Sequence, residues 1–218
     1  MSQVPAALGS DVGDKLVAIH QALDRAAVPH AFGGAIALAY AIFDPRATND
    51  IDINIAVSVD DAGRVVAALP SEVVARPDVI ETIRRDGQDR LRWGDVAVDL
   101  FFPQHELHAT VQERARRQPF RGFAIPVITA TDLTVFKTLF NRTKDWADIE
   151  AMLQAGAVDV TEARRWVETI LGNDHPSTIR LALLTEEVRA HPSEEAGFDS
   201  TLWKPIGSQA GRRPKTNG

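Results

Sequence analysis

Three aspartates in extended, apolar surroundings are the residues of this chain best suited to chemistry. Asp50 and Asp52 alternate with isoleucines in "NDIDINIAV", and Asp99 lies inside the apolar run "VAVDLFF". Residues two apart on a strand point to the same face, so Asp50 and Asp52 place two carboxylates side by side. Carboxylates held this close repel one another unless a cation lies between them. With Asp99 on a neighbouring strand, the three residues predict a site for two divalent ions, Mg²⁺ or alternatively Mn²⁺.

A pair of glycines precedes these acids. Gly33 and Gly34 lie in "HAFGGAIALAY", where they open a predicted helix. Because they lack side chains, a phosphate can approach the backbone, and the start of the helix directs amide groups at it. Nucleotidyl transfer depends mainly on positioning and charge neutralisation, which two metal ions can provide. We therefore predict a nucleoside triphosphate site in which Asp50 and Asp52 hold both metals, and Asp99 holds the one that activates an acceptor hydroxyl.

A second cluster of charged residues follows in "DLTVFKTLFNRTKDWADIEAML". Its members at intervals of four, three and four are Lys137, Asn141, Lys144 and Asp148. They share one face of a helix if that helix is unbroken. The compact charge of lysine suits a triphosphate, so Lys137 is a predicted nucleotide ligand. Lys144, with Asp145 or Asp148, is expected to line the base or acceptor pocket. Arg46, in the loop before Asp50, is a further phosphate candidate.

The order of these motifs resembles the nucleotidyltransferase superfamily with the polymerase-beta-like fold. The matching positions are Gly33, Gly34, Asp50, Asp52 and Asp99. "RATNDIDI" and "DLTVFKTLFNRTKDWADI" look most like the AbiEii-type nucleotidyltransferase toxins of type IV toxin–antitoxin systems, over about residues 28 to 155. Those toxins usually carry Ser as the second motif residue, where this chain has Gly34.

That resemblance implies further roles and partners. It implies that Lys137 and an acid of "KDWADI", which we assign as Asp148, join the catalytic residues. It implies nucleotide addition to a tRNA 3′ end by a toxin that a cognate antitoxin neutralises. Two alternatives stay open: transfer to a protein hydroxyl or a small molecule such as an aminoglycoside, and a non-catalytic binding module. A basic face near the acids would favour RNA, and a narrow acidic cleft would favour a cationic antibiotic. The best candidate for a basic face comprises Arg114, Arg116, Arg117 and Arg121.

Simpler interpretations exist for each residue. Two adjacent glycines most often form a turn, and an amphipathic lysine or a run of charges is usually solvated. Asp145 and Asp148 would then pair with Lys144 or Arg142. His30 is expected to be structural, Trp146 and Trp166 to be core residues, and His105 and His108 to be solvated rather than metal ligands. Asp99 is harder to explain simply, because a buried carboxylate without a partner is costly.

Hydrophobic periodicity predicts the elements that position these residues. Helices are expected at 13–27, 35–43, 60–69, 104–117, 132–156, 160–172 and 176–191. Strands are expected at 28–32, 51–57, 79–85, 89–94, 96–102 and 122–129. The fold class is α+β (α/β), with a small mixed sheet flanked by helices and then a helical C-terminal half. We expect a nucleotidyltransferase core at 1–128, a helical domain at 129–190 that completes the active site, and a flexible tail at 191–218.

Composition sets broad limits. The net charge of −6 gives no global basic footprint for nucleic acid, and the absence of cysteine excludes disulfides and thiol nucleophiles. No apolar run approaches the roughly 20 residues that a membrane-spanning helix needs. The first residues lack a basic segment before an apolar stretch, so we expect no secretory signal and a cytoplasmic protein.

Overall fold

Six strands form one mixed sheet in the computed structural model, which describes residues 10–191 of the chain. The strands are β1 (His30–Phe32), β2 (Asp50–Ile55), β3 (Gln88–Trp93), β4 (Val96–Phe101), β5 (Arg116–Phe120) and β6 (Phe123–Val127). Their order across the sheet is β3-β4-β2-β1-β6-β5. Strands β2 and β4 are parallel, as are β1 and β6, and the other neighbouring pairs are antiparallel. The strands that carry the three acids are therefore adjacent at the centre of the sheet.

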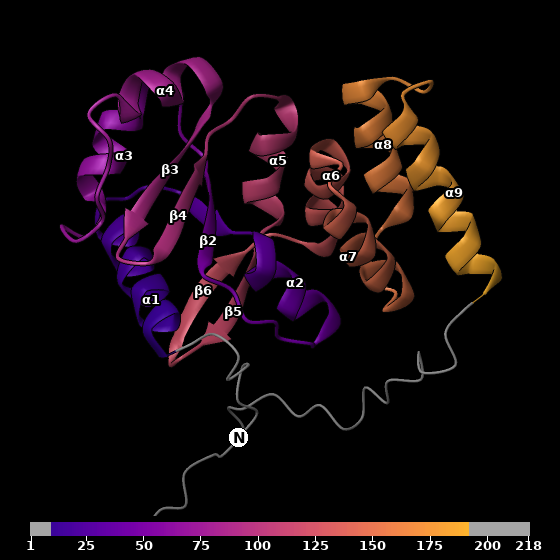
Figure 1. Cartoon of the computed structure of the whole chain (residues 1–218), viewed down its shortest axis with the longest axis horizontal. Coiled ribbons are helices and arrows are strands. Elements are labelled where there is room, and N and C mark those ends of the chain that lie inside the picture. The colour runs from indigo at the N-terminus through magenta and orange to yellow at the C-terminus, as the bar shows by residue number, and fades with distance from the viewer. Residues whose placement is uncertain (1–9, 192–218) are drawn as a thin grey trace, which may run out of the picture.

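Helices surround this sheet and continue beyond it. They are α1 (Ser10–Arg25), α2 (Gly34–Ile42), the 3-10 helix η1 (Val59–Asp61), α3 (Ala62–Ala68), α4 (Val79–Asp86), α5 (Glu106–Arg114), α6 (Ala130–Phe140), α7 (Thr143–Gln154), α8 (Val160–Leu171) and α9 (Pro176–Ala190). Helices α6 to α9 lie together on one side of the sheet (Figure 1). The expected fold class, a mixed sheet with flanking helices and a helical C-terminal part, is confirmed. The domain boundaries at 128 and 190 stay predictions, and the expected tail lies outside the described residues beyond His191.

Side chains along β2 and β4 point alternately to the two faces of the sheet, so one face of these strands packs in the core and the other carries the acids. Ile51 and Ile53 of β2 stand beside Val98 and Leu100 of β4, and all four are fully buried. The alternate residues of the same strands, including the three acids, must point to the opposite face of the sheet. The buried isoleucines thus fix the register, and a slip by one residue would turn the acids into the core.

The segment 79–85, predicted as a strand, is instead the helix α4. Its apolar residues Val79 and Ile83 are four apart and buried, so they form one helical face. Gly87 ends the helix in the left-handed conformation at φ 70°. The β-branched composition of "VIETI" suggested a strand, but helical spacing of the buried residues decided the structure.

Two predicted helices are shorter than expected. The helix expected at 104–117 ends at Arg114, and residues 116–120 form β5, which pairs with β6. Arg121 and Gly122 both have positive φ, at 48° and 85°, as a two-residue hairpin turn requires. The helix expected at 132–156 is broken at Asn141, which takes the left-handed conformation at φ 53°. Trp146 Nε1 donates a hydrogen bond to Asn141 Oδ1 at 2.8 Å and holds this break.

Among the described helices, none is both long enough and apolar enough to cross a membrane.

Candidate active site

The two central acids face each other across neighbouring strands. Asp52 of β2 is paired in register with Asp99 of β4, so their side chains lie on the same face of the sheet. Asp50, two residues before Asp52, lies on that face as well. On the other side of β2, the backbone N–H of Gly33 donates to the carbonyl of Asp52 at 2.9 Å. The structure thus brings together the acids and the glycine pair that the sequence placed far apart.

This concentration of negative charge affects the pKa of Asp52. Burial, together with the negative charges of Asp99 and Asp50, raises the pKa of Asp52 to about 6. Lys137 and Arg142 oppose the rise. The ionised form of Asp52 is therefore disfavoured, and a bound cation would stabilise it.

Asp99 differs because it has a strong cationic partner. Arg90 of β3 is in register with Asp99, and its Nε and one terminal nitrogen each donate to one carboxylate oxygen at 2.7 Å. Asp99 is 13% exposed whereas Arg90 is 53% exposed. The sequence reasoning missed Arg90, although its position in the alternating strand "DRLRW" beside the acids was a usable signal.

Gly34 fits the site because it has no side chain. Its φ is +50°, and a Cβ at this position would lie 1.8 Å from Asp52 Oδ2. The helix α2 begins here, and Gly33 provides no side-chain cap for its first amide groups. Any other residue at this position would collide with Asp52 in this arrangement. The N-terminus of α2 consequently opens directly beside the carboxylates.

A second charged group is assembled by the break between α6 and α7. The buried Lys137 donates to Asp148 Oδ2 at 2.7 Å and to Asp145 Oδ1 at 3.2 Å. Arg46 donates to Asp148 at 2.6 Å, and Arg142 Nε donates to Asp145 at 2.7 Å. The expectation that this cluster forms one face of an unbroken helix is wrong. The turn at Asn141 folds α7 back onto α6, which is what brings Lys137 to the two aspartates.

The cations of this group are held in fixed positions by acids behind them. Asp145 is fully buried, and although burial opposes it, the hydrogen bond from Arg142 and the charge of Lys137 lower its pKa. Arg46 and Arg142 are 48% and 56% exposed, so their guanidinium groups remain accessible. Arg142 also lies over the ring of Phe140, 4.9 Å from its centre. Arg142 was not among the predicted ligands, and Lys144 is exposed nearby.

Both charged groups line one cavity of about 1090 Å³. Its walls come from the start of α2, the loop before β2, the ends of β3 and β4, and helices α5 to α7. The predicted residues Gly34, Arg46, Asp50, Asp52, Asp99, Lys137, Lys144 and Asp148 all line it. Gly33 and Asp145 lie behind this surface and support Asp52 and Lys137. The volume exceeds the usual size of a small-molecule site, which is roughly 300–1,000 Å³.

The acidic residues fit divalent metal ions by their chemistry. Oxygen donors from three carboxylates are the ligands that Mg²⁺ and Mn²⁺ prefer, and the charges of Asp99 and Asp50 add to burial in raising the pKa of Asp52. Within residues 10–191 no three His, Asp or Glu side chains are already close enough to hold a metal ion. Both oxygens of Asp99 accept hydrogen bonds from Arg90 in this arrangement.

The histidines and tryptophans have structural surroundings. His30 is buried, its Nε2 lies 2.9 Å from His20 Nδ1, and its Nδ1 lies 2.8 Å from the Val28 carbonyl oxygen, which confirms a structural role. Trp146 and Trp166 are buried, as expected. His108 is half-buried, and its Nδ1 accepts a backbone hydrogen bond from Gln104 at 3.3 Å. His108 is thus not the fully solvated residue that we expected.

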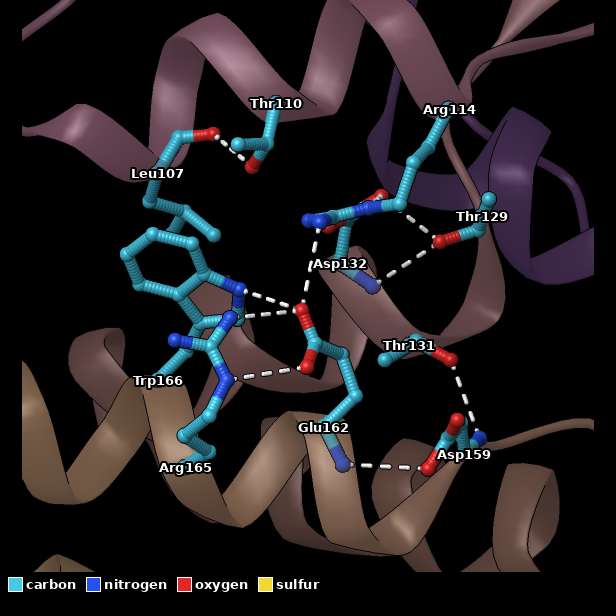
Figure 2. A network of polar contacts seen from close by, with 10 residues as sticks. All are labelled: Leu107, Thr110, Arg114, Thr129, Thr131, Asp132, Asp159, Glu162, Arg165 and Trp166. Carbon is cyan, nitrogen blue, oxygen red and sulfur yellow. Dashed lines mark hydrogen bonds and ion pairs between the residues drawn. The ribbon is translucent and has the colours of Figure 1, made fainter.

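The predicted basic face does not form as a surface for RNA beside the acids. Arg114 is directed inward, where it pairs with the fully buried Asp132 and with Glu162 (Figure 2). Arg121 pairs with Asp14 of α1 at 2.5 Å. Strand β5, which carries the other two arginines, is the sheet edge three strands away from β2. Hydrogen bonds from Arg165 and Trp166 to Glu162 lower the pKa of Glu162 to about 2, so this network is strongly ion-paired.

Comparisons with known proteins identify the fold. No family model and no curated protein matches the chain. The solution structure of the antibiotic-resistance factor ANT(2'')-Ia is similar, with a TM-score of 0.54, 13% identity, and coverage of 84% of this chain and 100% of that chain. A crystal structure of ANT(2'')-Ia in complex with adenylyl-2''-tobramycin has a TM-score of 0.49, 15% identity, and coverage of 83% and 98%.

A third similar structure is an antigenic nucleotidyltransferase-like protein from Paracoccidioides brasiliensis, with a TM-score of 0.47, 19% identity, and coverage of 86% and 92%. At such identities the similarity concerns the fold alone, and the solution structure of ANT(2'')-Ia is the comparison on which that conclusion rests. The chain has a nucleotidyltransferase fold, as the order of its motifs indicated.

Proposed function

We propose that this protein is a metal-dependent nucleotidyltransferase that moves a nucleoside monophosphate from a nucleoside triphosphate to an acceptor hydroxyl. The observation that carries the proposal is the pairing of Asp52 with Asp99 on one sheet face, with Asp50 on that face and the start of α2 beside them. Burying the Asp52 carboxylate beside the negative charge of Asp99, which raises the pKa of Asp52, is costly in a purely structural role. In a nucleotidyltransferase fold, such carboxylates would bind the divalent metal ions that the reaction needs.

In the proposed reaction the acceptor oxygen attacks the α-phosphorus, the bond from that phosphorus to the bridging oxygen of the β-phosphate breaks, and pyrophosphate leaves. The hydroxyl proton passes to one of the site carboxylates. Divalent ions held by Asp50, Asp52 and Asp99 would neutralise phosphate charge and make the acceptor hydroxyl more acidic. The protein itself contributes position, through the α2 amide groups and the cations on the opposite wall.

The triphosphate is assigned to the cation-rich wall. Lys137, Arg46 and Arg142 line the cavity and are oriented by buried aspartates, so they lose little freedom when phosphate binds. Phe140 is 43% exposed and lies in this cavity with Phe101, their ring centres 6.0 Å apart. These rings provide an apolar surface on which the base of ATP or another nucleotide can stack. The catalytic role of Asp148 stays a prediction, because its oxygens bind Lys137 and Arg46.

The acceptor that the cavity favours is a small molecule. A volume of about 1090 Å³ accommodates a nucleotide together with a compact acceptor. Asp86 and Asp89 line the same cavity, where each is paired with an exposed arginine, Arg85 and Arg76 respectively. These carboxylates suit an acceptor that carries hydroxyl and amino groups. The four arginines of the expected basic face are paired with acids or lie at the far edge of the sheet.

A tRNA 3′ end is the second candidate acceptor, and a toxin neutralised by a cognate antitoxin is the corresponding role. The observation in its favour is that Lys144 and Arg142, both exposed, lie at the rim of the cavity near the start of α7. Such cations would contact the phosphates of an entering strand.

One experiment distinguishes these possibilities. Purified protein would be incubated with Mg²⁺ and each nucleoside triphosphate, labelled in turn at the α- and γ-phosphate, with an aminoglycoside panel, deacylated tRNA or a protein extract as acceptor. The Asp52→Asn variant serves as the inactive control. We expect α-label on an acceptor and release of γ-label as pyrophosphate. Transfer to a small molecule supports the first acceptor, and transfer to tRNA supports the second. Transfer of γ-label, or no transfer to any acceptor, would contradict the proposed reaction.

A further inference from the structure

Arg90 occupies the place of a cation at Asp99. Its guanidinium binds both carboxylate oxygens at 2.7 Å, and these are the oxygens that a metal ion at Asp99 would need. Asp52, in register with Asp99, has no comparable cationic partner among the described residues. A divalent ion that uses all three acids must therefore compete with Arg90 for Asp99.

The ion pair between Arg90 and Asp99 is accessible enough for each residue to take another partner. Arg90 is 53% exposed on β3, which is an edge strand of the sheet, and it lines the cavity assigned to the nucleotide. An accessible ion pair of this kind is held much less firmly than a fully buried one. A guanidinium that leaves Asp99 remains in the same cavity, where its fork of donors matches a phosphate as well as it matches a carboxylate.

We propose that Arg90 is an exchangeable counter-ion that couples metal binding to nucleotide binding. Without ligands it neutralises Asp99 and weakens the binding of free divalent ions. When a metal–nucleotide complex enters, the guanidinium moves from Asp99 to the triphosphate, and Asp99 joins Asp50 and Asp52 as a metal ligand. This inference rests on the proposed function and adds to it a nucleotide-binding residue that the sequence motifs do not include.

The test measures Mn²⁺ binding by electron paramagnetic resonance, with and without a non-hydrolysable α,β-methylene nucleoside triphosphate. In the wild type we expect weak binding of Mn²⁺ alone and at least tenfold tighter binding with the nucleotide. Arg90→Ala should bind Mn²⁺ alone several-fold more tightly than the wild type, and the tightening caused by nucleotide should largely disappear. Arg90→Lys, which keeps the charge but loses the bidentate fork, should lie between them.

Arg92→Ala is the matched control. Arg92 is exposed on the same strand and, two residues away, on the same face, so its removal takes one positive charge from the same face of β3. It is not among the residues that line the cavity. We expect Arg92→Ala to keep the wild-type coupling between Mn²⁺ and nucleotide. Thermal melts of each variant show that it is folded, and Arg90→Gln replaces Arg90→Ala if the latter does not fold.

The outcomes separate this inference from the function on which it rests. If the wild type binds Mn²⁺ and nucleotide together but Arg90→Ala behaves like the wild type or like Arg92→Ala, Arg90 is only a structural partner and the inference is overturned. If the wild type binds neither Mn²⁺ nor the nucleotide, both the proposed function and this inference are overturned. The inference is supported if Arg90→Ala, but not Arg92→Ala, binds Mn²⁺ more tightly in the absence of nucleotide and loses the coupling between Mn²⁺ and nucleotide.

Discussion

Asp52 and Asp99 lie directly opposite each other on the parallel strands β2 and β4, and Arg90 lies opposite Asp99 on β3. One level of the sheet therefore carries an arginine and two aspartates in a row, with the start of α2 at its end. The isoleucines and valines of the reverse face fix this register. The arrangement of the charged side chains is thus a consequence of core packing, and it can be tested through both stability and activity.

Replacing Asp52 by Asn should stabilise the metal-free protein at neutral pH. The folded-state pKa of about 6 lies above the ordinary value of 3.8, so the native protein keeps a proton that the unfolded chain releases. Stability therefore falls as the pH rises from about 4 to about 6 and stays lower above that range. Asp52→Asn avoids this loss, and the gain at pH 8 should reach about 3 kcal/mol, since one pKa unit corresponds to ~1.4 kcal/mol.

Urea denaturation with EDTA at pH 4.5 and pH 8 measures this effect. The gain should fall to about 1 kcal/mol at pH 4.5, and Asp174→Asn, at an exposed position outside the site, should show little gain at either pH. Added Mg²⁺ should stabilise the wild type more than the variant. An Asp52→Asn protein that is less stable than the wild type at pH 8 in EDTA would count against the repulsion among the acids.

Gly34→Ala should destabilise the protein and remove its activity. The added Cβ would need a left-handed φ and would lie 1.8 Å from Asp52 Oδ2, so Asp52 must move. We expect a loss of about 1–3 kcal/mol in the free energy of unfolding, the usual cost of such backbone strain. Gly63→Ala is the matched control, because Gly63 lies in α3 with nothing within 4 Å of the new Cβ. That variant should gain about 0.5–1 kcal/mol; equal effects of the two substitutions would argue against a close approach at Gly34.

Lys137→Met should weaken both the fold and triphosphate binding. The buried acids Asp145 and Asp148 would each lose one cationic partner but keep an arginine. We expect a loss of about 3 kcal/mol, the lower end of the cost of breaking a buried ion pair. Lys144→Met, at an exposed position on the same cavity, should change stability by less than about 0.5 kcal/mol. Chemical denaturation and nucleotide titration measure the two effects, and a stable Lys137→Met protein with unchanged nucleotide affinity would disprove the assignment.

Arg114→Ala tests whether that arginine is structural. Its guanidinium pairs with Asp132, which is fully buried at the start of α6, and with Glu162 of α8 (Figure 2). Truncation leaves the charge of Asp132 buried, with Thr129 as a remaining hydrogen-bond partner, so we expect a loss of about 3–5 kcal/mol. Arg116→Ala, at an exposed position of β5, should be nearly neutral in urea denaturation. If instead both variants keep full stability but lose affinity for RNA, the basic segment has the nucleic-acid role first considered for it.

The sequence was sufficient to predict the elements that carry the acids, because alternation of Asp and Ile in β2 leaves only one arrangement with a buried face. It was not sufficient where a helix and a strand share a composition, as in α4, whose Val79 and Ile83 show helical spacing over only a short segment. The break at Asn141 was also missed, since the hydrogen bond to Trp146 that holds it depends on tertiary structure. Arg90 was not predicted, and Arg142 was predicted only as a surface partner of the acids, because the importance of both residues comes from what lies opposite them, which spacing along the chain does not record.

The most direct test of the account is to count the Mn²⁺ ions that the protein binds together with a non-hydrolysable nucleoside triphosphate, using electron paramagnetic resonance on the wild type, Asp50→Asn, Asp52→Asn and Asp99→Asn. We predict two protein-bound ions in the wild type, and loss of one or both when any of the three acids is replaced. Wild-type stoichiometry and affinity in Asp52→Asn would contradict the claim that these facing carboxylates form a metal and nucleotide site.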